Sequence, residues 1–234
     1  MKNQKKFKQP PKRFQPKGIT VLYEDHDILV VDKKSGLLTM STGKEGEKTA
    51  YFLLTDYVRK GNPKSKNRIF IVHRLDRDTS GVLVFAKNEK AKRSLQDNWQ
   101  GFEKKYSAVV LGTLAKKEGV LQSYLAENSI HKMYSVSSSE KGVLAKTGYK
   151  VLKESKQYSL LEIDLLTGKK NQIRAQFSEQ SHPVAGDKKY GKKQTGIKRL
   201  TLHAASITLL HPHTKERMTF EAKIPGYFYS LLND

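Results

Sequence analysis

Residues 69–87 read IFIVHRLDRDTSGVLVFAK and contain two short apolar runs, IFIV and VLVFA, on either side of a charged stretch. Apolar runs of four or five residues have the length of buried strands. The stretch from His73 to Gly81 is therefore expected to be a loop that joins two buried strands. It holds two carboxylates and three side chains that are or can become cationic: Asp76, Asp78, His73, Arg74 and Arg77.

Residue chemistry alone gives this loop two interpretations. So many charges at the end of a buried strand are suited to the rim of an active site. The alternative is a capped turn in which Asp76 and Asp78 bond the backbone and the two arginines are solvated partners. Neither interpretation is favoured before other parts of the chain are considered.

Outward from this loop, the sequence alternates between strand and helix signals. Residues 19–31 predict a β-hairpin that turns at residues 24–27. Apolar spacing predicts helices at residues 49–59 and around residues 91–99. Further strands are expected at residues 106–111, 130–137, 147–153, 158–165, 200–210 and 217–222. This mixture lacks regular βαβ alternation, so it predicts an α+β fold with a mixed, largely antiparallel central sheet.

The charge of the chain favours a polyanionic partner. Lys and Arg total 44 against 23 Asp and Glu, a formal net charge of +21, and nucleic acids bind basic proteins with release of counterions. Residues 1–18 carry seven of the basic residues, no acid and three prolines, and are expected to be a disordered arm. Residues 19–234 keep +14 of the +21 and are expected to form one folded domain. The alternative is a basic surface that only confers solubility.

Several function classes are excluded or disfavoured by composition. The chain has no cysteine, which excludes disulfides, thiolate nucleophiles and Cys-based zinc sites. No stretch has the length and apolarity of a membrane span, and the basic N-terminus lacks the apolar core of a secretory signal. A soluble, cytoplasmic protein that does not bind membranes is expected.

The stretch HRLDRDTSGVLVFAK resembles the signature segment of the RluA-type family of RNA pseudouridine synthases. Family-like segments continue in order along the chain, so that the resemblance covers nearly all of residues 19–232. Besides Gly36-Leu37-Leu38, they are residues 105–112, residues 167–174, residues 182–187 and residues 202–205. The resemblance implies the pseudouridine synthase fold, with flanking helices and an RNA-binding cleft.

The resemblance also implies an activity, the conversion of specific uridines in structured ribosomal or transfer RNA to pseudouridine by base flipping. Detaching uracil from C1′ and rejoining it through C5 involves neither net redox change nor hydrolysis, so no cofactor and no metal are expected. The expected partner is RNA, and the expected state is a monomer.

Three residues match the catalytic positions of the family. Asp76 matches its essential aspartate, a carboxylate able to attack or stabilise an electron-poor sugar carbon. Addition to the base, bonding to the sugar and assistance to a glycal-like intermediate all remain open. Tyr106 matches a tyrosine beside the target uridine and is a candidate proton acceptor, although an ordinary tyrosine pKa is near ~10. Arg174 matches an arginine that pairs with the catalytic aspartate.

Other residues are candidates for binding the substrate. Arg74 resembles the family residue that enters the position vacated by the flipped base, a task suited to a planar guanidinium. His73 and Arg77 are expected to support the loop or to contact phosphate. Ile173 is a candidate apolar surface beside uracil, with a core role as its alternative, and Lys169 is a candidate RNA contact.

The chain departs from the family pattern in three places. Lys33-Lys34-Ser35-Gly36 stands where the family commonly has Lys-Pro followed by a small residue and glycine, so this loop is expected to be less rigid. Lys169, Lys170 and Asn171 replace an Arg-Thr-His sequence, which removes a bidentate donor and an imidazole. Many relatives also carry a small N-terminal RNA-binding domain, whereas here the predicted hairpin follows residues 1–18 directly. The chain is therefore expected to be the catalytic core alone.

Two other functions are compatible with parts of the sequence. A noncatalytic RNA-binding module would keep the fold without the reaction, and the presence of Asp76, Tyr106 and Arg174 argues against it. A metal-dependent hydrolase would use His211 and His213 with a distant carboxylate. The His-Pro-His-Thr stretch is more typical of a turn.

Overall fold

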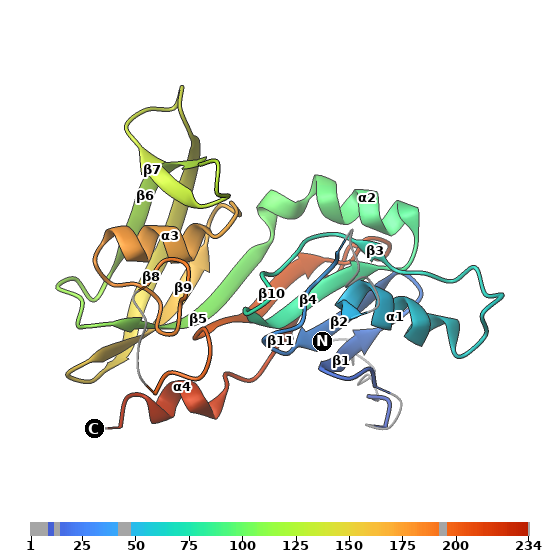
Figure 1. Ribbon diagram of the computed structural model, residues 1–234. Coiled ribbons are helices and arrows are strands. Elements are labelled where there is room, and N and C mark those ends of the chain that lie inside the picture. The colour runs from blue at the N-terminus through green and yellow to red at the C-terminus, as the bar shows by residue number, and fades with distance from the viewer. Residues whose placement is uncertain (1–8, 12–14, 42–47, 192–195, 234) are drawn as a thin grey trace. The chain divides into compact units, whose positions relative to one another are not determined.

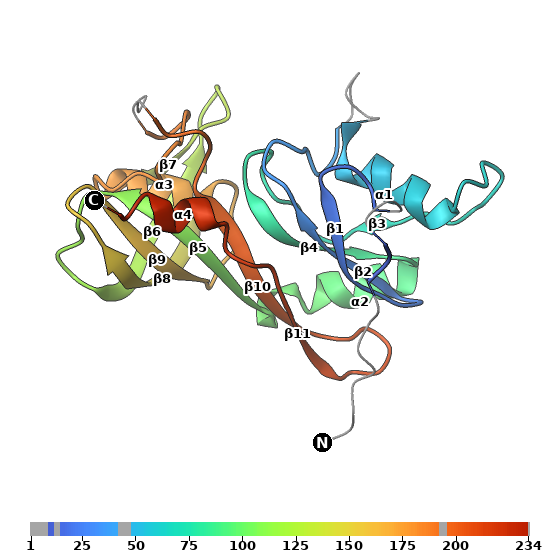
Figure 2. The same cartoon turned by 90° about the horizontal axis from the view of Figure 1, so that it is seen from below.

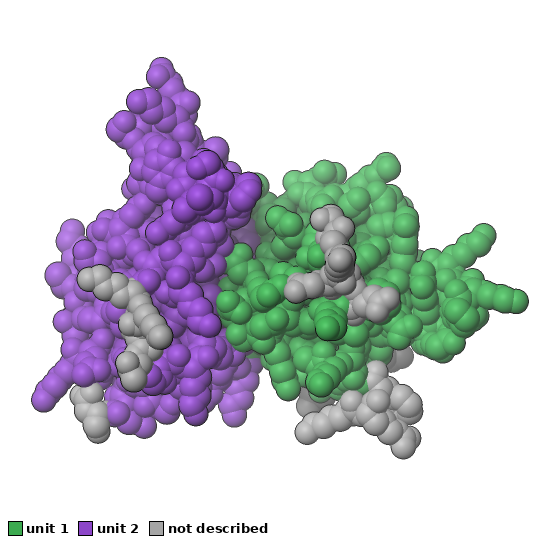
Figure 3. Space-filling model, in the orientation of Figure 1, with its two compact units in different colours: residues 1–102, 206–222 green, residues 103–205, 223–234 purple. Residues whose placement is uncertain are grey.

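The computed structural model describes residues 9–11, 15–41, 48–191 and 196–233. The chain forms two compact units, coloured separately in Figure 3. Unit 1 comprises residues 1–102 and 206–222, and unit 2 comprises residues 103–205 and 223–234. Most of the predicted arm at residues 1–18 lies outside the described residues, so its disorder stays a prediction.

Within the described residues the chain has eleven strands and four α-helices (Figure 1). The strands are β1 (Ile19–Glu24), β2 (Ile28–Lys33), β3 (Phe70–Ile71), β4 (Ser80–Ala86), β5 (Glu103–Leu111), β6 (Glu118–Glu127), β7 (Met133–Val136), β8 (Val143–Glu154), β9 (Tyr158–Leu165), β10 (Leu202–Leu210) and β11 (Arg217–Glu221). The helices are α1 (Ala50–Arg59), α2 (Glu89–Asp97), α3 (Gln172–Glu179) and α4 (Gly226–Ser230), with a 3₁₀ turn, η3 (Trp99–Gly101), after α2.

The strands belong to one sheet in the order β1-β2-β4-β10-β5-β9-β8-β6-β7, with β11 paired to β10 and β3 to β4. Neighbouring strands such as β2 and β4, or β5 and β9, run antiparallel. Residues 202–205 of β10 belong to unit 2 and residues 206–210 to unit 1. The predicted α+β class with a largely antiparallel sheet is confirmed.

Unit 1 is a sheet covered on both faces. All four apolar residues of β2, from Ile28 to Val31, are fully buried, which requires cover on each side because successive side chains point to opposite faces. Figure 2 shows α1 and α2 on opposite faces of β1, β2 and β4. Thr49 caps α1 by accepting a hydrogen bond from the Phe52 N–H, and Asn88 caps α2 in the same way through Ala91.

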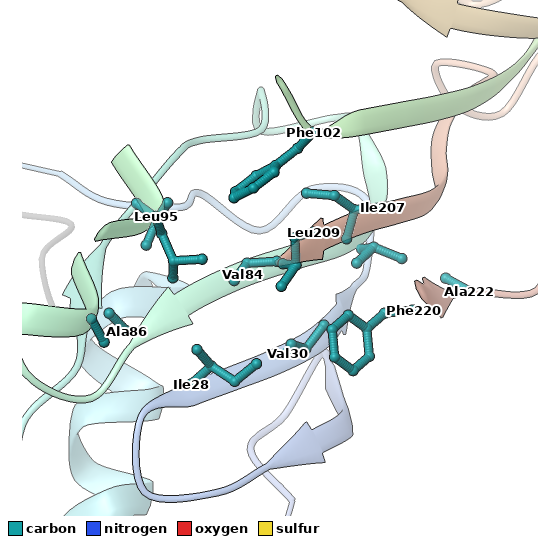
Figure 4. Packing of buried hydrophobic residues seen from close by; sticks show 13 residues of the cluster. Ile28, Val30, Val84, Ala86, Leu95, Phe102, Ile207, Leu209, Phe220 and Ala222 are labelled. Carbon is teal, nitrogen blue, oxygen red and sulfur yellow. The ribbon is translucent and has the colours of Figure 1, made fainter. Parts of the chain in front are cut away.

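One buried cluster joins α2 to the sheet of unit 1 (Figure 4). Leu95 of α2 lies among side chains of β2, β4, β10 and β11, and Phe102 closes the same cluster. Ile28, Val30, Val84 and Ala86, which face α2, are also labelled in Figure 4.

Unit 2 is built on β5, β9, β8, β6 and β7, with a helix on either side (Figure 1). Alternate residues of β5 belong to different clusters, Ala108 and Val110 with α3, and Val109 with α4. Two buried glutamines also fix α3. Gln172 donates to the Lys146 carbonyl at 3.0 Å, and Gln176 donates to the Ala145 carbonyl at 3.1 Å.

Most predicted elements are confirmed, with shifts at their ends, but β6, α3 and α4 were not predicted. β6 has a single buried residue, Leu125, so it lacks the apolar run of a core strand. α3 buries two glutamines, so its buried face does not show a continuous apolar pattern in the sequence. α4 has only five residues, too few for a helical period to appear.

Leu95→Ala is expected to destabilise the protein by at least about 2 kcal/mol, because it removes a fully buried side chain and leaves a cavity. Urea unfolding measures the change. Leu210→Ala, at a position in the same unit that is 44% exposed, serves as the control and should stay within about 0.5 kcal/mol. Equal effects of the two substitutions would contradict the core described for unit 1.

Candidate active site

The loop that carries Asp76 connects β3 to β4, as the sequence predicts. The strand before it differs from the prediction, because β3 has only Phe70 and Ile71, and both are half-buried. The loop closes with a turn in which the Thr79 N–H donates to the Asp76 carbonyl at 3.2 Å. Leu75 is buried, Asp76 is half-buried, and Arg74 and Arg77 are exposed. Leu75 thus anchors the loop in the protein while its charged neighbours reach solvent.

A buried lysine, Lys33, holds this loop by a hydrogen bond to its backbone. Lys33, at the end of β2, is 0% exposed, and its ammonium donates to the carbonyls of Lys34, Leu37 and Arg77 at 3.1, 2.8 and 3.1 Å. Burying a charge is costly unless hydrogen bonds satisfy it. The three carbonyl oxygens supply these bonds, so the backbone next to Asp76 is held by a charged group.

The rest of the 33–39 segment adds bonds on both sides of Asp76. Thr39 Oγ1 donates to the Leu75 carbonyl at 2.8 Å and accepts from the Leu75 N–H at 3.2 Å. Ser35 Oγ donates to the Asp78 carbonyl at 2.7 Å, and the Gly36 N–H donates to the Arg77 carbonyl at 2.9 Å. Gly36 has φ +88°, a left-handed conformation that favours glycine. The backbone at residues 75, 77 and 78 is therefore fixed by the preceding loop.

His73 takes part in this support. Its Nε2 accepts a hydrogen bond from the Val84 N–H at 3.0 Å, and its ring stacks on Trp99 with centroids 4.3 Å apart. A ring nitrogen that accepts from a backbone amide carries no proton, so the imidazole is neutral in this geometry. These contacts favour loop support over phosphate contact.

In unit 2, Tyr106 lies on β5 and is half-buried. It packs against the cluster that contains Ile173 of α3. Ile173 is buried, which favours its core role. Lys104 lies two residues before Tyr106, on the same face of the strand. Burial lowers the pKa of Lys104.

Arg174, the next residue of α3, forms an ion pair with Asp187. Its Nε donates to Asp187 Oδ2 at 2.6 Å and its Nη2 to Oδ1 at 2.8 Å, a two-pronged geometry that only arginine provides. Burial by itself would raise the pKa of the Asp187 carboxyl. The Arg174 hydrogen bonds and charge, with the backbone N–H groups of Tyr190 and Lys189, outweigh burial and lower that pKa.

Three of the residues that depart from the family pattern lie just before α3. Lys170 pairs with Glu127, and Lys169 is half-exposed. Asn171 has a left-handed backbone with φ 49°, which asparagine tolerates better than most residues. Its side chain accepts a hydrogen bond from the Tyr190 hydroxyl at 3.3 Å.

The predicted site residues thus fall into two sets. Unit 1 contributes Asp76 with its neighbours His73, Arg74 and Arg77, and unit 2 contributes Tyr106, Lys169, Ile173 and Arg174. Within unit 2 the fold brings Tyr106 and Ile173 to one cluster. The pairing of Arg174 with Asp76 stays a prediction.

His211, a ligand in the alternative metal-hydrolase interpretation, lies in a turn in which both of its ring nitrogens are hydrogen-bonded. His211 has Asp25 and Asp27 close to it, but its Nδ1 accepts N–H bonds from His213 and Thr214 at 3.3 and 3.1 Å. Nε2 therefore carries the proton, and it lies 2.8 Å from Asp25 Oδ2. Both nitrogens are occupied, which favours a structural role.

Comparisons with known proteins define the class. A family model described as RNA pseudouridylate synthase matches residues 27–179. The ribosomal large subunit pseudouridine synthase C of Buchnera aphidicola is 35% identical over 228 residues, covering 91% of this chain and 69% of the relative. An uncharacterised RNA pseudouridine synthase of Bacillus subtilis is 32% identical, covering 94% of this chain and 74% of the relative.

A solved structure shows the same fold. Human RNA pseudouridylate synthase domain containing 4 superposes with a TM-score of 0.74 at 24% identity, covering 89% of this chain and 90% of that one. The chain therefore belongs to the RNA pseudouridylate synthase family, a class of isomerases. The predicted family and fold are confirmed. Among the described residues, no helix is long and apolar enough to cross a bilayer.

Several residues of the site carried no clear signal in the sequence. Lys33 begins the Lys33-Lys34-Ser35-Gly36 stretch, which departs from the family pattern, but nothing in that stretch indicates that its side chain is buried. Asp187 lies in a segment that resembles the family, but no spacing rule connects it to Arg174, thirteen residues earlier. Tyr190 lies among lysines in the sequence, and nothing in this pattern indicates a contact with Arg174.

Lys33→Met is expected to lower the free energy of unfolding by at least about 2 kcal/mol, because it leaves three backbone carbonyls without their charged donor. Thermal unfolding measures this change. Lys34→Met, at the exposed neighbouring position, is the matched control and should unfold like the wild type. Equal stability of the two variants would show that Lys33 does not hold the loop.

Proposed function

We propose that this protein converts uridines of ribosomal RNA to pseudouridine with Asp76 as the catalytic carboxylate. The proposal rests on the loop between β3 and β4, which Lys33 and Thr39 hold by hydrogen bonds. This loop places the half-buried carboxylate of Asp76 between two exposed arginines. Relatives named as large-subunit ribosomal synthases favour ribosomal RNA over transfer RNA as the substrate.

The reaction exchanges one bond of the base for another. The bond between N1 and C1′ breaks, the base turns, and a bond between C5 and C1′ forms. The proton on C5 then leaves, and N1 gains a proton. Asp76 supports the first step through its negative charge near C1′, as carboxylates do at glycosidic carbons. The reaction balances without a redox partner, so the proposal includes no cofactor.

A uridine stacked in folded RNA must leave its stack to reach a carboxylate on a protein loop. Arg74 is exposed, and Leu75 beside it is fixed by Thr39. A planar guanidinium on an anchored backbone is suited to occupy the vacated position, because it can stack and donate hydrogen bonds at once. Arg77, exposed on the other side of Asp76, is suited to contact phosphate.

Tyr106 is proposed to accept the C5 proton. It is half-buried at the edge of the cluster around Ile173, so its ring has an apolar support while part of it remains accessible. Arg174 is proposed to pair with Asp76 and keep it ionised. The net charge of +21 supports association with RNA. A monomeric, cytoplasmic enzyme completes the proposal.

Asp76→Asn is expected to abolish the modification, because the amide cannot supply negative charge at C1′. Pseudouridine is mapped in ribosomal and transfer RNA from a strain that lacks the protein, complemented with wild type or with variants. Wild type should restore the lost sites and Asp76→Asn should restore none.

Asp78→Asn is the matched control for this mapping, since Asp78 is an exposed carboxylate in the same turn. It should restore the sites as well as wild type does. Restoration by Asp76→Asn would show that another group is essential. Losses confined to transfer RNA would reassign the substrate.

Tyr106→Phe is expected to keep RNA affinity and to lower the single-turnover rate at least about 100-fold, the usual range for loss of a proton-transfer group. The rate is measured on RNA that contains a modified site. Tyr134→Phe, which alters a 45% exposed tyrosine of the same unit, should retain the rate. A wild-type rate in Tyr106→Phe would remove the phenol from the proton transfer.

A further inference from the structure

We propose that Asp187 and Tyr190 are positioning residues, which fix the guanidinium of Arg174 in one orientation for the reaction. This inference rests on the proposed function, because it assigns the two residues to the active arginine. It adds roles for side chains that do not themselves act on the base.

The ion pair with Asp187 fixes the guanidinium of Arg174 through two hydrogen bonds. Asp187 receives both Nε and Nη2, at 2.6 and 2.8 Å, on its two carboxylate oxygens. Two parallel bonds fix the plane of the group, whereas a single bond would leave it free to rotate. The Asp187 side chain is 0% exposed and that of Arg174 is 12% exposed, so water competes little for these bonds.

Asp187 is itself held by the backbone around it. Its Oδ1 accepts the N–H groups of Lys189 at 2.9 Å and of Tyr190 at 3.0 Å, and its own N–H donates to the Val184 carbonyl at 3.1 Å. The preceding residue, Gly186, has φ +76°, and a Cβ there would lie 2.2 Å from the Arg199 carbonyl oxygen. The carboxylate therefore sits in a turn that only glycine permits.

Tyr190 supplies a second contact to the same guanidinium. Its ring lies 5.1 Å from Arg174 Cζ, within the range of a cation–π interaction. Its hydroxyl accepts the Met133 N–H at 2.8 Å and donates to Asn171 Oδ1 at 3.3 Å. The ring is thus fixed between the start of β7 and the residue before α3.

This arrangement explains what the ion pair contributes beyond stability. An arginine side chain that is free in solution must lose rotamer freedom each time it acts. A guanidinium already fixed by a carboxylate and a ring does not lose that freedom during the reaction, and preorganised charges are the ones that stabilise transition states.

The test compares Asp187→Asn with wild type. The amide keeps an oxygen for the backbone N–H groups of Lys189 and Tyr190, but turns an NH₂ group toward Arg174 Nε, where two donors then meet. Asp164→Asn, at an exposed aspartate of the same unit, is the matched control. Thermal unfolding establishes that each variant is folded.

The first measurement is the hydrogen exchange of the Arg174 Nε–H by NMR, with the resonance identified by its loss in Arg174→Lys. Exchange should be slow in wild type and in Asp164→Asn, and at least about 10-fold faster in Asp187→Asn, because a closed hydrogen bond protects its proton. An unchanged exchange rate in Asp187→Asn would overturn the inference. This measurement does not depend on activity.

The second measurement is a double-mutant cycle in pseudouridine formation. Asp187→Asn should lower kcat roughly 10- to 100-fold with KM nearly unchanged in wild type, but should have little effect in an Arg174→Lys background. An equal loss of kcat in both backgrounds would show that Asp187 acts through the fold, and would overturn the positioning role. If wild type forms no pseudouridine, the proposed function fails, while the exchange measurement still decides the orientation of Arg174.

Discussion

The burial of the Lys33 ammonium is the constraint on which the site in unit 1 depends. A charge at this depth persists only where hydrogen bonds replace water, and here the backbone carbonyls of residues 34, 37 and 77 replace it. Residues 34–37 and the loop before β4 must therefore adopt fixed conformations together. Asp76 lies in the second of these loops, so the position of a reactive carboxylate follows from a requirement of folding.

Unit 2 also contains a buried charged group held by hydrogen bonds, but here the group is an anion that accepts them. There a buried carboxylate, Asp187, collects donors from Arg174 and from the backbone of residues 189 and 190. Buried ion pairs contribute little net stability, because desolvation cancels much of their attraction. Their effect is on geometry, since a partly satisfied pair would be costly and only one arrangement satisfies all groups. Both units thus fix charged groups through the backbone.

The sequence predicts what depends on local pattern and misses what depends on long-range contacts. The hairpin of β1 and β2 and the helix α1 follow from apolar periodicity and turn residues. The loop around Asp76 was placed correctly because apolar runs flank it. α3 was missed because its buried Gln172 and Gln176 are polar, and their hydrogen bonds to other strands are invisible along the chain.

In the candidate site, too, some residues could be predicted from the sequence and others depend on long-range contacts. Asp76, Tyr106 and Arg174 could be named only through resemblance to a family, since their types and spacing are ordinary. Lys33 and Asp187 have partners up to 44 residues away in sequence. Their roles become apparent only when the fold brings these partners within hydrogen-bond distance.

The role of Asp76 is tested most directly by the release of tritium from RNA labelled at C5 of uridine. Isomerisation replaces the bond between C5 and hydrogen with a bond to C1′, so each pseudouridine formed must release one tritium to water. The wild type should release tritium in a one-to-one ratio with pseudouridine, and Asp76→Asn should release none. Release by Asp76→Asn at the wild-type rate would contradict the assignment of Asp76 as the catalytic carboxylate.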